Sequence, residues 1–113
     1  MKRISTHVLD VSRGRPAHDV PVRLEKQEKS GDWQVLNSAR TDHDGRCAQL
    51  LPSEELSPGI YRLVFNTASY FSKAKVEVLY PVVEITFHVR DGESHFHIPL
   101  LLTANGYTTY RGS

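Results

Sequence analysis

Apolar and polar residues alternate along most of this chain, and turn signals interrupt the alternation every few residues. The clearest run is Val82–Arg90, where an apolar series alternates with Glu84, Thr86 and His88, the apolar members being Val83, Ile85, Phe87 and Val89. Successive side chains of a strand point to opposite faces, so a period of two predicts strands with one buried face. Asp91-Gly92, directly after this run, is typical of a tight turn.

About eight such runs follow one another at intervals of roughly 8–12 residues, which is typical of an all-β sandwich. The expected strands are Ile4–Asp10, Val20–Lys26, Trp33–Arg40, Arg46–Leu50, Ile60–Asn66, Val82–Arg90, His95–Leu102 and Tyr107–Tyr110. Thr67–Lys75 carries alanine and aromatic residues without a helix breaker, so it predicts the one short helix. Arg13-Gly14-Arg15-Pro16 is expected to break the first strand, and Gly45 closes a polar turn that begins at Thr41.

The length of 113 residues predicts a single domain, 1–113, with one hydrophobic core. The net charge is +1 and both signs are scattered, so nothing electrostatic favours a nucleic-acid or membrane partner. The single cysteine, Cys47, requires no oxidising compartment. Met1–His7 lacks the apolar stretch of a signal peptide, so a cytoplasmic location is expected, with a periplasmic or peroxisomal setting left open.

The histidines are the first candidates for chemistry: His7, His18, His43, His88, His95 and His97. His18 and His43 fall in expected turns and His88 on a polar strand face, so these three are interpreted as solvated surface residues. His95 and His97 share one face of a strand and, with His7 as a third ligand, have the geometry to bind a metal. The chain has no HExxH motif and no cysteine pair, so structural, metal-binding and acid–base roles all stay open.

The remaining candidates are ordinary when judged by pattern alone. His7 shares a strand face with Ser5 and Leu9, where a core or rim histidine is expected. Arg46 follows an Asp-Gly turn, where a surface arginine is common, and nothing marks the neighbouring Cys47 as a nucleophile. The end of the chain is unusual, because two tyrosines and an arginine in its last seven residues predict a docked terminus.

Several stretches together resemble the transthyretin family along nearly the whole chain. Ile4–Asp10 with Arg13–Ala17 is similar to the family's opening strand and turn, Asn66–Phe71 to its single helix, and Tyr80–Phe87 to its next strand. His95–Leu102 and the terminal Tyr110-Arg111-Gly112-Ser113 resemble the 5-hydroxyisourate hydrolase branch rather than the thyroid-hormone carrier branch. The tetrapeptide is specific because it follows the His7, Arg46 and His97 segments in order and ends the chain.

The resemblance implies a transthyretin-like sandwich of two four-stranded antiparallel sheets and a homotetramer, a dimer of dimers with a central channel. It implies that the channel ends hold active sites in which His7, Arg46 and His97 are catalytic. His7, Arg46 and Tyr110 would bind the substrate, and a supporting tail would be formed by Arg111, Gly112 and Ser113. The implied reaction hydrolyses the N1–C6 amide bond of 5-hydroxyisourate to 2-oxo-4-hydroxy-4-carboxy-5-ureidoimidazoline, in urate degradation to allantoin, without a metal or other cofactor.

These residue types suit that reaction. Histidine titrates near neutral pH, so His7 and His97 are expected to form the acid–base pair that activates water. Arginine stays charged and donates in a fork, so Arg46 is expected to polarise the carbonyl oxygens of a planar, oxygen-rich ring. Tyr110 is expected to orient substrate or water, and His95 has a secondary place beside His97.

Three alternatives stay open at this point. One is a non-catalytic carrier of a small aromatic ligand with the same fold. Another is a zinc hydrolase that uses His7, His95 and His97 as ligands. The last is a sandwich domain that only mediates interactions, for which replacing His97 would change nothing measurable.

Overall fold

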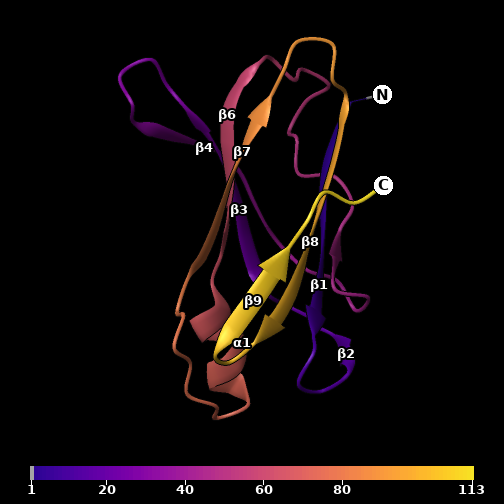
Figure 1. The fold of residues 1–113 in the computed structure, drawn as a ribbon, viewed down its shortest axis with the longest axis vertical. Coiled ribbons are helices and arrows are strands. Elements are labelled where there is room, and N and C mark those ends of the chain that lie inside the picture. The colour runs from indigo at the N-terminus through magenta and orange to yellow at the C-terminus, as the bar shows by residue number, and fades with distance from the viewer. Residues whose placement is uncertain (1) are drawn as a thin grey trace.

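Two β-sheets packed face to face make up the computed structural model, which describes residues 2–113 (Figure 1). One sheet is antiparallel and has the order β4-β3-β6-β7, formed by Trp33–Arg40, Pro21–Gln27, Gly59–Phe65 and Val83–Val89. The other has the order β2-β1-β8-β9, formed by Arg15–Pro16, Arg3–Asp10, His95–Thr103 and Gly106–Thr109. A further strand, β5 (Arg46–Cys47), also pairs with β1. The expected all-β sandwich is confirmed.

The second sheet differs from the four antiparallel strands that were expected. It has five strands, and its central pair, β1 and β8, runs parallel from Arg3 opposite His95 to Asp10 opposite Leu102. A parallel pair needs a long connection, and here the whole of the first sheet lies between the two strands in the chain. The strand β2 was expected to be only a breaker. Gly14, at φ +67°, turns the chain back so that Pro16 pairs opposite Leu9 at the edge of the sheet, where a missing N–H is tolerated.

The segment expected as the strand Arg46–Leu50 forms a regular strand only over its first two residues. It still runs beside β1, because the backbone N–H of Leu50 donates to the Ile4 carbonyl over 2.8 Å. Next to Leu50, the side chain of Gln49 makes hydrogen bonds to the β1 backbone that a paired strand would otherwise make. Its Oε1 accepts from the N–H of Ile4, and its Nε2 donates to the carbonyl of Lys2. An amide side chain can mimic a peptide group, which alternation of apolar residues does not reveal.

The core lies between the sheets and is filled by alternate residues of each strand. In β1, Ile4, Thr6 and Val8 are buried, whereas the residues between them are half-buried and face outward. The largest fully buried side chains include Tyr61, Phe65, Leu24 and Leu100. Removing this apolar surface from water is the main force that holds the sheets together. The same alternation places His7 on the outer face of its sheet.

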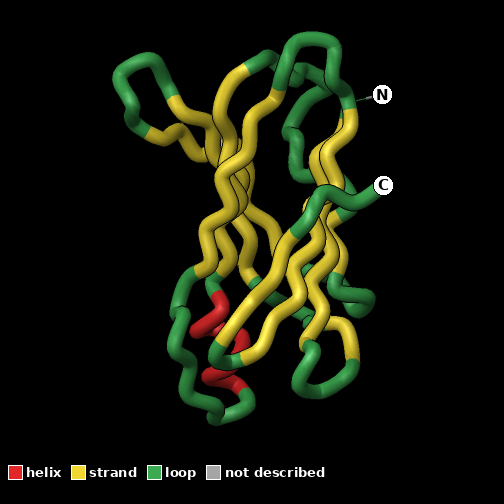
Figure 2. The backbone as a smooth tube through the Cα atoms, in the orientation of Figure 1, coloured by secondary structure: helices red, strands yellow, loops and turns green. Residues whose placement is uncertain are grey.

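Within residues 2–113 there is one helix, α1 (Thr67–Lys73), which lies at one end of the sandwich (Figure 2). It was expected to extend to Lys75, but Lys75 has a φ of +57°, which cannot continue a right-handed helix. Asn66 caps its start by accepting the N–H of Ser69. The hydroxyl of Tyr70 donates to the buried carboxylate of Asp10 over 2.7 Å and so fixes α1 to the end of β1. Among the described residues no helix is long and apolar enough to cross a membrane.

Candidate active site

The predicted site residues come together on the outer face of the sheet that contains β1 and β8. In the β1–β8 ladder, Ser5 lies opposite His97, and in the β1–β5 ladder, His7 lies opposite Arg46. Side chains of directly paired residues project from the same face of a sheet. Residues 92 positions apart, Ser5 and His97, are therefore neighbours on the surface that also presents His7 and Arg46.

A cleft of about 450 Å³ opens on this face. Its lining includes four of the predicted site residues and six others, namely Arg46, His97, Gly112 and Ser113 together with Arg3, Ser5, Thr6, Ala48, His95 and Phe96. His7 and Tyr110 are not among the lining residues. His7 is half-buried beside Arg46 in the ladder, and Tyr110 is 57% exposed. The structure therefore brings Arg46, His97, Gly112 and Ser113 into one cleft and leaves His7, Tyr110 and Arg111 outside its lining.

The turn before Arg46 is built to hold that residue against β1. The carboxylate of Asp42 accepts the backbone N–H groups of Asp44 and Arg46, each over 2.9 Å. The N–H of Arg46 lowers the pKa of the Asp42 carboxyl below its usual value, and that of Asp44 adds to the effect. Gly45 has a φ of +76° and lies against β1, where a Cβ atom would stand 2.3 Å from the Val8 carbonyl oxygen. Only glycine fits here, as the polar-turn prediction required.

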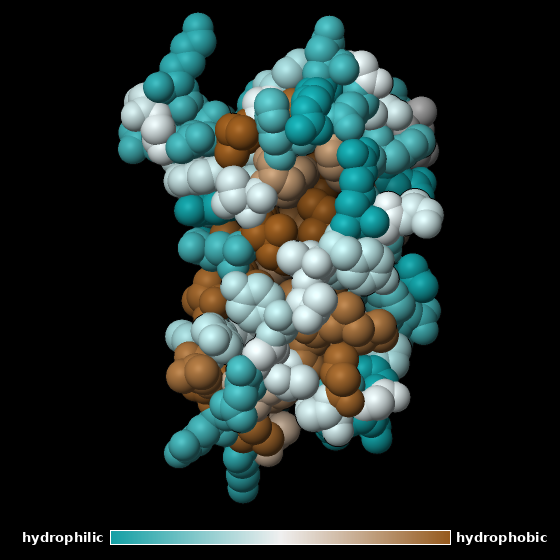
Figure 3. Space-filling model, viewed as in Figure 1, coloured by the Kyte–Doolittle hydropathy of each residue, from teal (hydrophilic) through white to brown (hydrophobic). Residues whose placement is uncertain are grey.

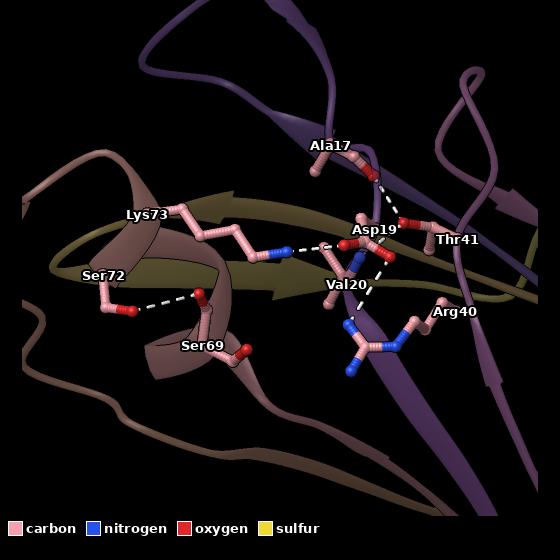
Figure 4. A network of polar contacts seen from close by, with 8 residues as sticks. All are labelled: Ala17, Asp19, Val20, Arg40, Thr41, Ser69, Ser72 and Lys73. Carbon is pink, nitrogen blue, oxygen red and sulfur yellow. Dashed lines mark hydrogen bonds and ion pairs between the residues drawn. The ribbon is translucent and has the colours of Figure 1, made fainter.

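The start of this turn is tied to the loop before β3 and to α1 (Figure 4). The buried hydroxyl of Thr41 accepts the N–H of Val20 over 2.8 Å and donates to the Ala17 carbonyl over 2.7 Å. In the same network Asp19 binds Lys73 over 2.5 Å and Arg40 over 3.4 Å, as Figure 4 shows. The base of the Arg46 turn is therefore held from two sides.

His18 and His43 lie on these two loops and, as predicted, are exposed. Their rings nevertheless stack, with centroids 4.3 Å apart and an angle of 18° between the planes. Neither lines the cleft. His88 is also exposed on its strand, as expected. These three histidines therefore stand apart from the candidate site.

The ring of His97 is held by a side chain that the sequence prediction did not include. Its Nδ1 lies 2.8 Å from the Ser5 hydroxyl oxygen, and the two groups share a hydrogen bond. Burial lowers the pKa of His97 below its usual value, and Arg46 and then His7 lower it further. This direction favours the neutral imidazole, which is the form that can accept a proton.

The tail docks on the start of β8. The N–H of Gly112 donates to the His97 carbonyl over 2.7 Å, and a Cβ atom at Gly112 would stand 2.5 Å from Cδ2 of His97. Arg111 reaches the opposite way: its guanidinium donates to Glu93 and to the His95 carbonyl and lies 4.5 Å from the centre of the Phe96 ring. Because residue 112 is a glycine, the tail can contact the His97 ring, and Arg111 fixes the tail in place through Glu93 and the His95 carbonyl.

Arg46 differs from the arginines that form ion pairs with carboxylates elsewhere in residues 2–113. Within residues 2–113, the guanidinium of Arg46 forms no ion pair with a carboxylate. His95, exposed at the rim, lines the same cleft as His97, as their spacing predicted.

Within residues 2–113, no group of three or more His, Cys, Asp or Glu side chains could hold a metal ion. Cys47 is buried, and burial raises the pKa of its thiol to about 11.

Sequence reasoning missed Ser5 and Glu93 as contributors to this site. Ser5 was identified only as a neighbour on the His7 face, and the register that pairs it with His97 is not visible in either strand alone. Glu93 belongs to the turn between β7 and β8, and the sequence analysis assigned it no role. The charge of Arg111 could have indicated Glu93, because an arginine side chain in a docked tail is expected to pair with a carboxylate.

The paired sheets, the parallel β1–β8 pair and the polar cleft at the chain's end define a transthyretin-like sandwich with a polar site. A model of the HIUase/Transthyretin family matches residues 4–112, and the chain belongs to this family. A protein of Salmonella dublin named 5-hydroxyisourate hydrolase is 44% identical over 110 residues, which are 97% of this chain and 80% of that protein. The structure of Klebsiella pneumoniae 5-hydroxyisourate hydrolase is similar with a TM-score of 0.87 and 36% identity, over the full length of both chains. Transthyretin from Sparus aurata has a TM-score of 0.92 at 26% identity, covering 99% of this chain and 97% of its own.

Proposed function

We propose that this chain hydrolyses 5-hydroxyisourate at the cleft between β1, β5 and β8. The observation that carries the proposal is that His97 lines the same cleft as Arg46, whose guanidinium forms no ion pair with a carboxylate among residues 2–113; burial and Arg46 lower the pKa of His97. A planar, oxygen-rich heterocycle supplies the acceptors that Arg46 lacks, and a neutral imidazole supplies the base that amide hydrolysis requires. The relatives named 5-hydroxyisourate hydrolase support the same substrate.

In the proposed reaction, water adds to the C6 carbonyl carbon and the C6–N1 bond then breaks. His97 and His7 act as the acid–base pair: one takes a proton from water, and the other gives a proton to the departing N1. Arg46 donates to the carbonyl oxygen and stabilises the negative charge that develops on it. The product is 2-oxo-4-hydroxy-4-carboxy-5-ureidoimidazoline, and the step belongs to urate degradation to allantoin.

The tail has a supporting role in this proposal. Gly112 and Ser113 close one side of the cleft, and Arg111 holds them there through Glu93 and the His95 carbonyl. Tyr110 is assigned to substrate binding, and its exposed ring would reach the substrate from outside the cleft. The proposal includes no metal or other cofactor, and its proposed setting is the cytoplasm, where the lone thiol of Cys47 needs no partner.

A homotetramer, formed as a dimer of dimers around a central channel, is part of the same proposal. The strands β7 and β9 are each an edge strand of their sheet, opposite the edges at β4 and β2, and an unpaired edge can pair with a second copy. Figure 3 views the side where both edges lie in front, and apolar side chains gather along its middle. The exposed large apolar residues next to these edges are Leu79, Tyr80, Val82 and Tyr107. The outer face with the clefts would then line the channel.

The test is the decay of freshly made 5-hydroxyisourate, generated by urate oxidase and followed by its ultraviolet absorbance. Accelerated decay in proportion to protein concentration is expected, and it should survive prolonged treatment with a chelator. Decay at the spontaneous rate would contradict the proposal. If the protein then retained an aromatic ligand, the hydrolase proposal would give way to the alternative function of a non-catalytic carrier, which the similarity to Sparus aurata transthyretin favours.

A further inference from the structure

We propose that Ser5 is a positioning residue that accepts a hydrogen bond from Nδ1–H of His97 and leaves Nε2 as the unprotonated ring nitrogen facing the cleft. The inference rests on the proposed function and assigns the base within it. In this assignment His97 takes the proton from water, and His7 gives the proton to the leaving nitrogen. Neither the family resemblance nor the predicted site included Ser5.

Contacts on two sides determine how the His97 ring is oriented. The Ser5 hydroxyl lies 2.8 Å from Nδ1, on the side of β1. The backbone of Gly112 lies against Cδ2, so close that a Cβ atom there would stand 2.5 Å away. Nδ1 and Cδ2 are the two ring atoms bonded to Cγ, so the edge that remains carries Cε1 and Nε2. Since His97 lines the cleft, this free edge is the one that can meet a substrate.

The positive charge in the cleft favours one of the two neutral tautomers of His97. A neutral imidazole has one N–H and one lone pair, and the hydrogen bond made by one nitrogen sets the state of the other. Arg46, whose charge disfavours a proton on His97, lines the same cleft, and His7 acts in the same direction. His95 adds a further imidazole to the cleft lining. A lone pair facing this positive, donor-rich cleft is stabilised, whereas an N–H facing it is destabilised.

The Ser5 hydroxyl can serve as the acceptor because its own hydrogen is not needed for the ring. Ser5 is half-buried and itself lines the cleft, so its O–H can donate to a water or to the substrate. Its backbone is held within the β1–β8 pair, directly opposite His97. The distance between the two groups is therefore set by the sheet and does not depend on a mobile loop.

The experiment compares Ser5→Ala and Ser5→Thr with wild type, using imidazole ¹⁵N NMR of the whole protein and steady-state kinetics. In wild type, His97 should be the Nδ1–H tautomer. Ser5→Ala should give a mixture of tautomers and lower kcat by roughly tenfold to a hundredfold, with KM within about twofold, because the base loses its orientation. Ser5→Thr keeps a hydroxyl and should restore both readouts. Ser38→Ala, an exposed serine on the other sheet, is the matched control and should resemble wild type.

Three results would overturn the proposal: a wild-type His97 in the Nε2–H tautomer, an unchanged His97 spectrum in Ser5→Ala, or an unchanged kcat in that variant. The NMR readout does not require turnover. If wild type failed to hydrolyse 5-hydroxyisourate while the tautomer still depended on Ser5, the proposed function would fail and the structural role of Ser5 would stand.

Discussion

Two groups of charged side chains lie on the outer faces of the two sheets, and they differ in how their charges are balanced. On the β3–β6 side, the buried carboxylate of Glu25 binds Arg23 over 2.5 Å and also binds Arg62. Arg62 in turn lies 4.1 Å from the Trp33 ring centre and 3.6 Å from Glu84. On the β1–β8 side, Arg46 has no such partner within residues 2–113.

The difference separates a structural cluster from a candidate reactive one. In the Glu25 cluster each charge is satisfied by a neighbour, so a ligand would have to compete with contacts already made. In the cleft, positive groups lie near one another, and their repulsion contributes to the lowered pKa of His97. Groups whose pKa values are perturbed in a cleft are typical of functional sites, whereas paired charges more often hold strands together.

Removing His97, which lines the cleft, or His7, which lies beside Arg46 in the ladder, should give the largest effect on turnover. His97→Ala and His7→Ala should each lower kcat by about 100-fold or more, because general acid–base catalysis is lost. The midpoint of thermal unfolding should change little, since both side chains lie on the outer face. His43→Ala removes an exposed histidine outside the cleft and should keep wild-type turnover. A variant that keeps its activity would remove that histidine from the site.

Breaking the Glu25 cluster should lower the stability of the protein and leave its turnover unchanged, the reverse of the effect expected for the two histidines. Glu25→Ala leaves Arg23 and Arg62 without their buried partner and should lower the free energy of unfolding by about 2–4 kcal/mol, with turnover of the folded protein unchanged. Glu84→Ala, whose carboxylate is half exposed, should cost less than about 1 kcal/mol. Urea unfolding of the three proteins measures both values. Equal losses for the two variants would show that the buried cluster contributes no more than a surface pair.

Replacing Gly112 tests the contact between the tail and the His97 ring. Gly112→Ala places a methyl group 2.5 Å from Cδ2 of His97, so either the tail or the ring must move. Turnover should fall by roughly tenfold to a hundredfold, as small displacements of catalytic groups do. Gly31→Ala has open space around its Cβ position and is the control, in the turn between β3 and β4 of the other sheet, with an expected cost in stability only. Wild-type turnover in Gly112→Ala would mean that the tail does not position His97.

The acidic side of the pH profile gives the smallest effect. Burial and the charges of Arg46 and His7 hold the pKa of His97 below 6.5, so the neutral base persists on acidification until the pH falls below that value. The acidic limb of kcat/KM should therefore lie below pH 6.5. Replacing Arg46 by methionine removes a positive neighbour and should move the limb upward, toward 6.5. A limb that stays in place or moves downward would contradict the electrostatic account.

Much of the fold could be predicted because alternation is a local property of each strand. In Val83–Val89 the apolar residues are buried or half-buried and the residues between them are exposed, as the pattern predicted, and the helix starts at the predicted Thr67. The parallel pairing of β1 with β8 was not predictable in this way, since it joins segments from opposite ends of the chain. The substitution of the Gln49 side chain for backbone pairing also has no signature in hydrophobic pattern.

The candidate site was predictable only through the family resemblance. By pattern, His7 and Arg46 were a rim histidine and a surface arginine, and nothing local joined either of them to His97. The sheet register makes them neighbours, and the same register brings in Ser5. Tyr110 is the residue whose predicted role the cleft geometry supports least, because its ring is exposed on the outside.

The central claim is that unpaired charge in the cleft performs chemistry and that paired charge on the opposite sheet does not. The direct measurement is kcat/KM for 5-hydroxyisourate in Arg46→Met and Arg23→Met, two identical replacements on the two faces. Arg46→Met should lose at least about 100-fold, because a donor to the developing oxyanion is removed. Arg23→Met should stay within about twofold of wild type. Similar losses in both variants, or near wild-type turnover in Arg46→Met, would contradict the claim.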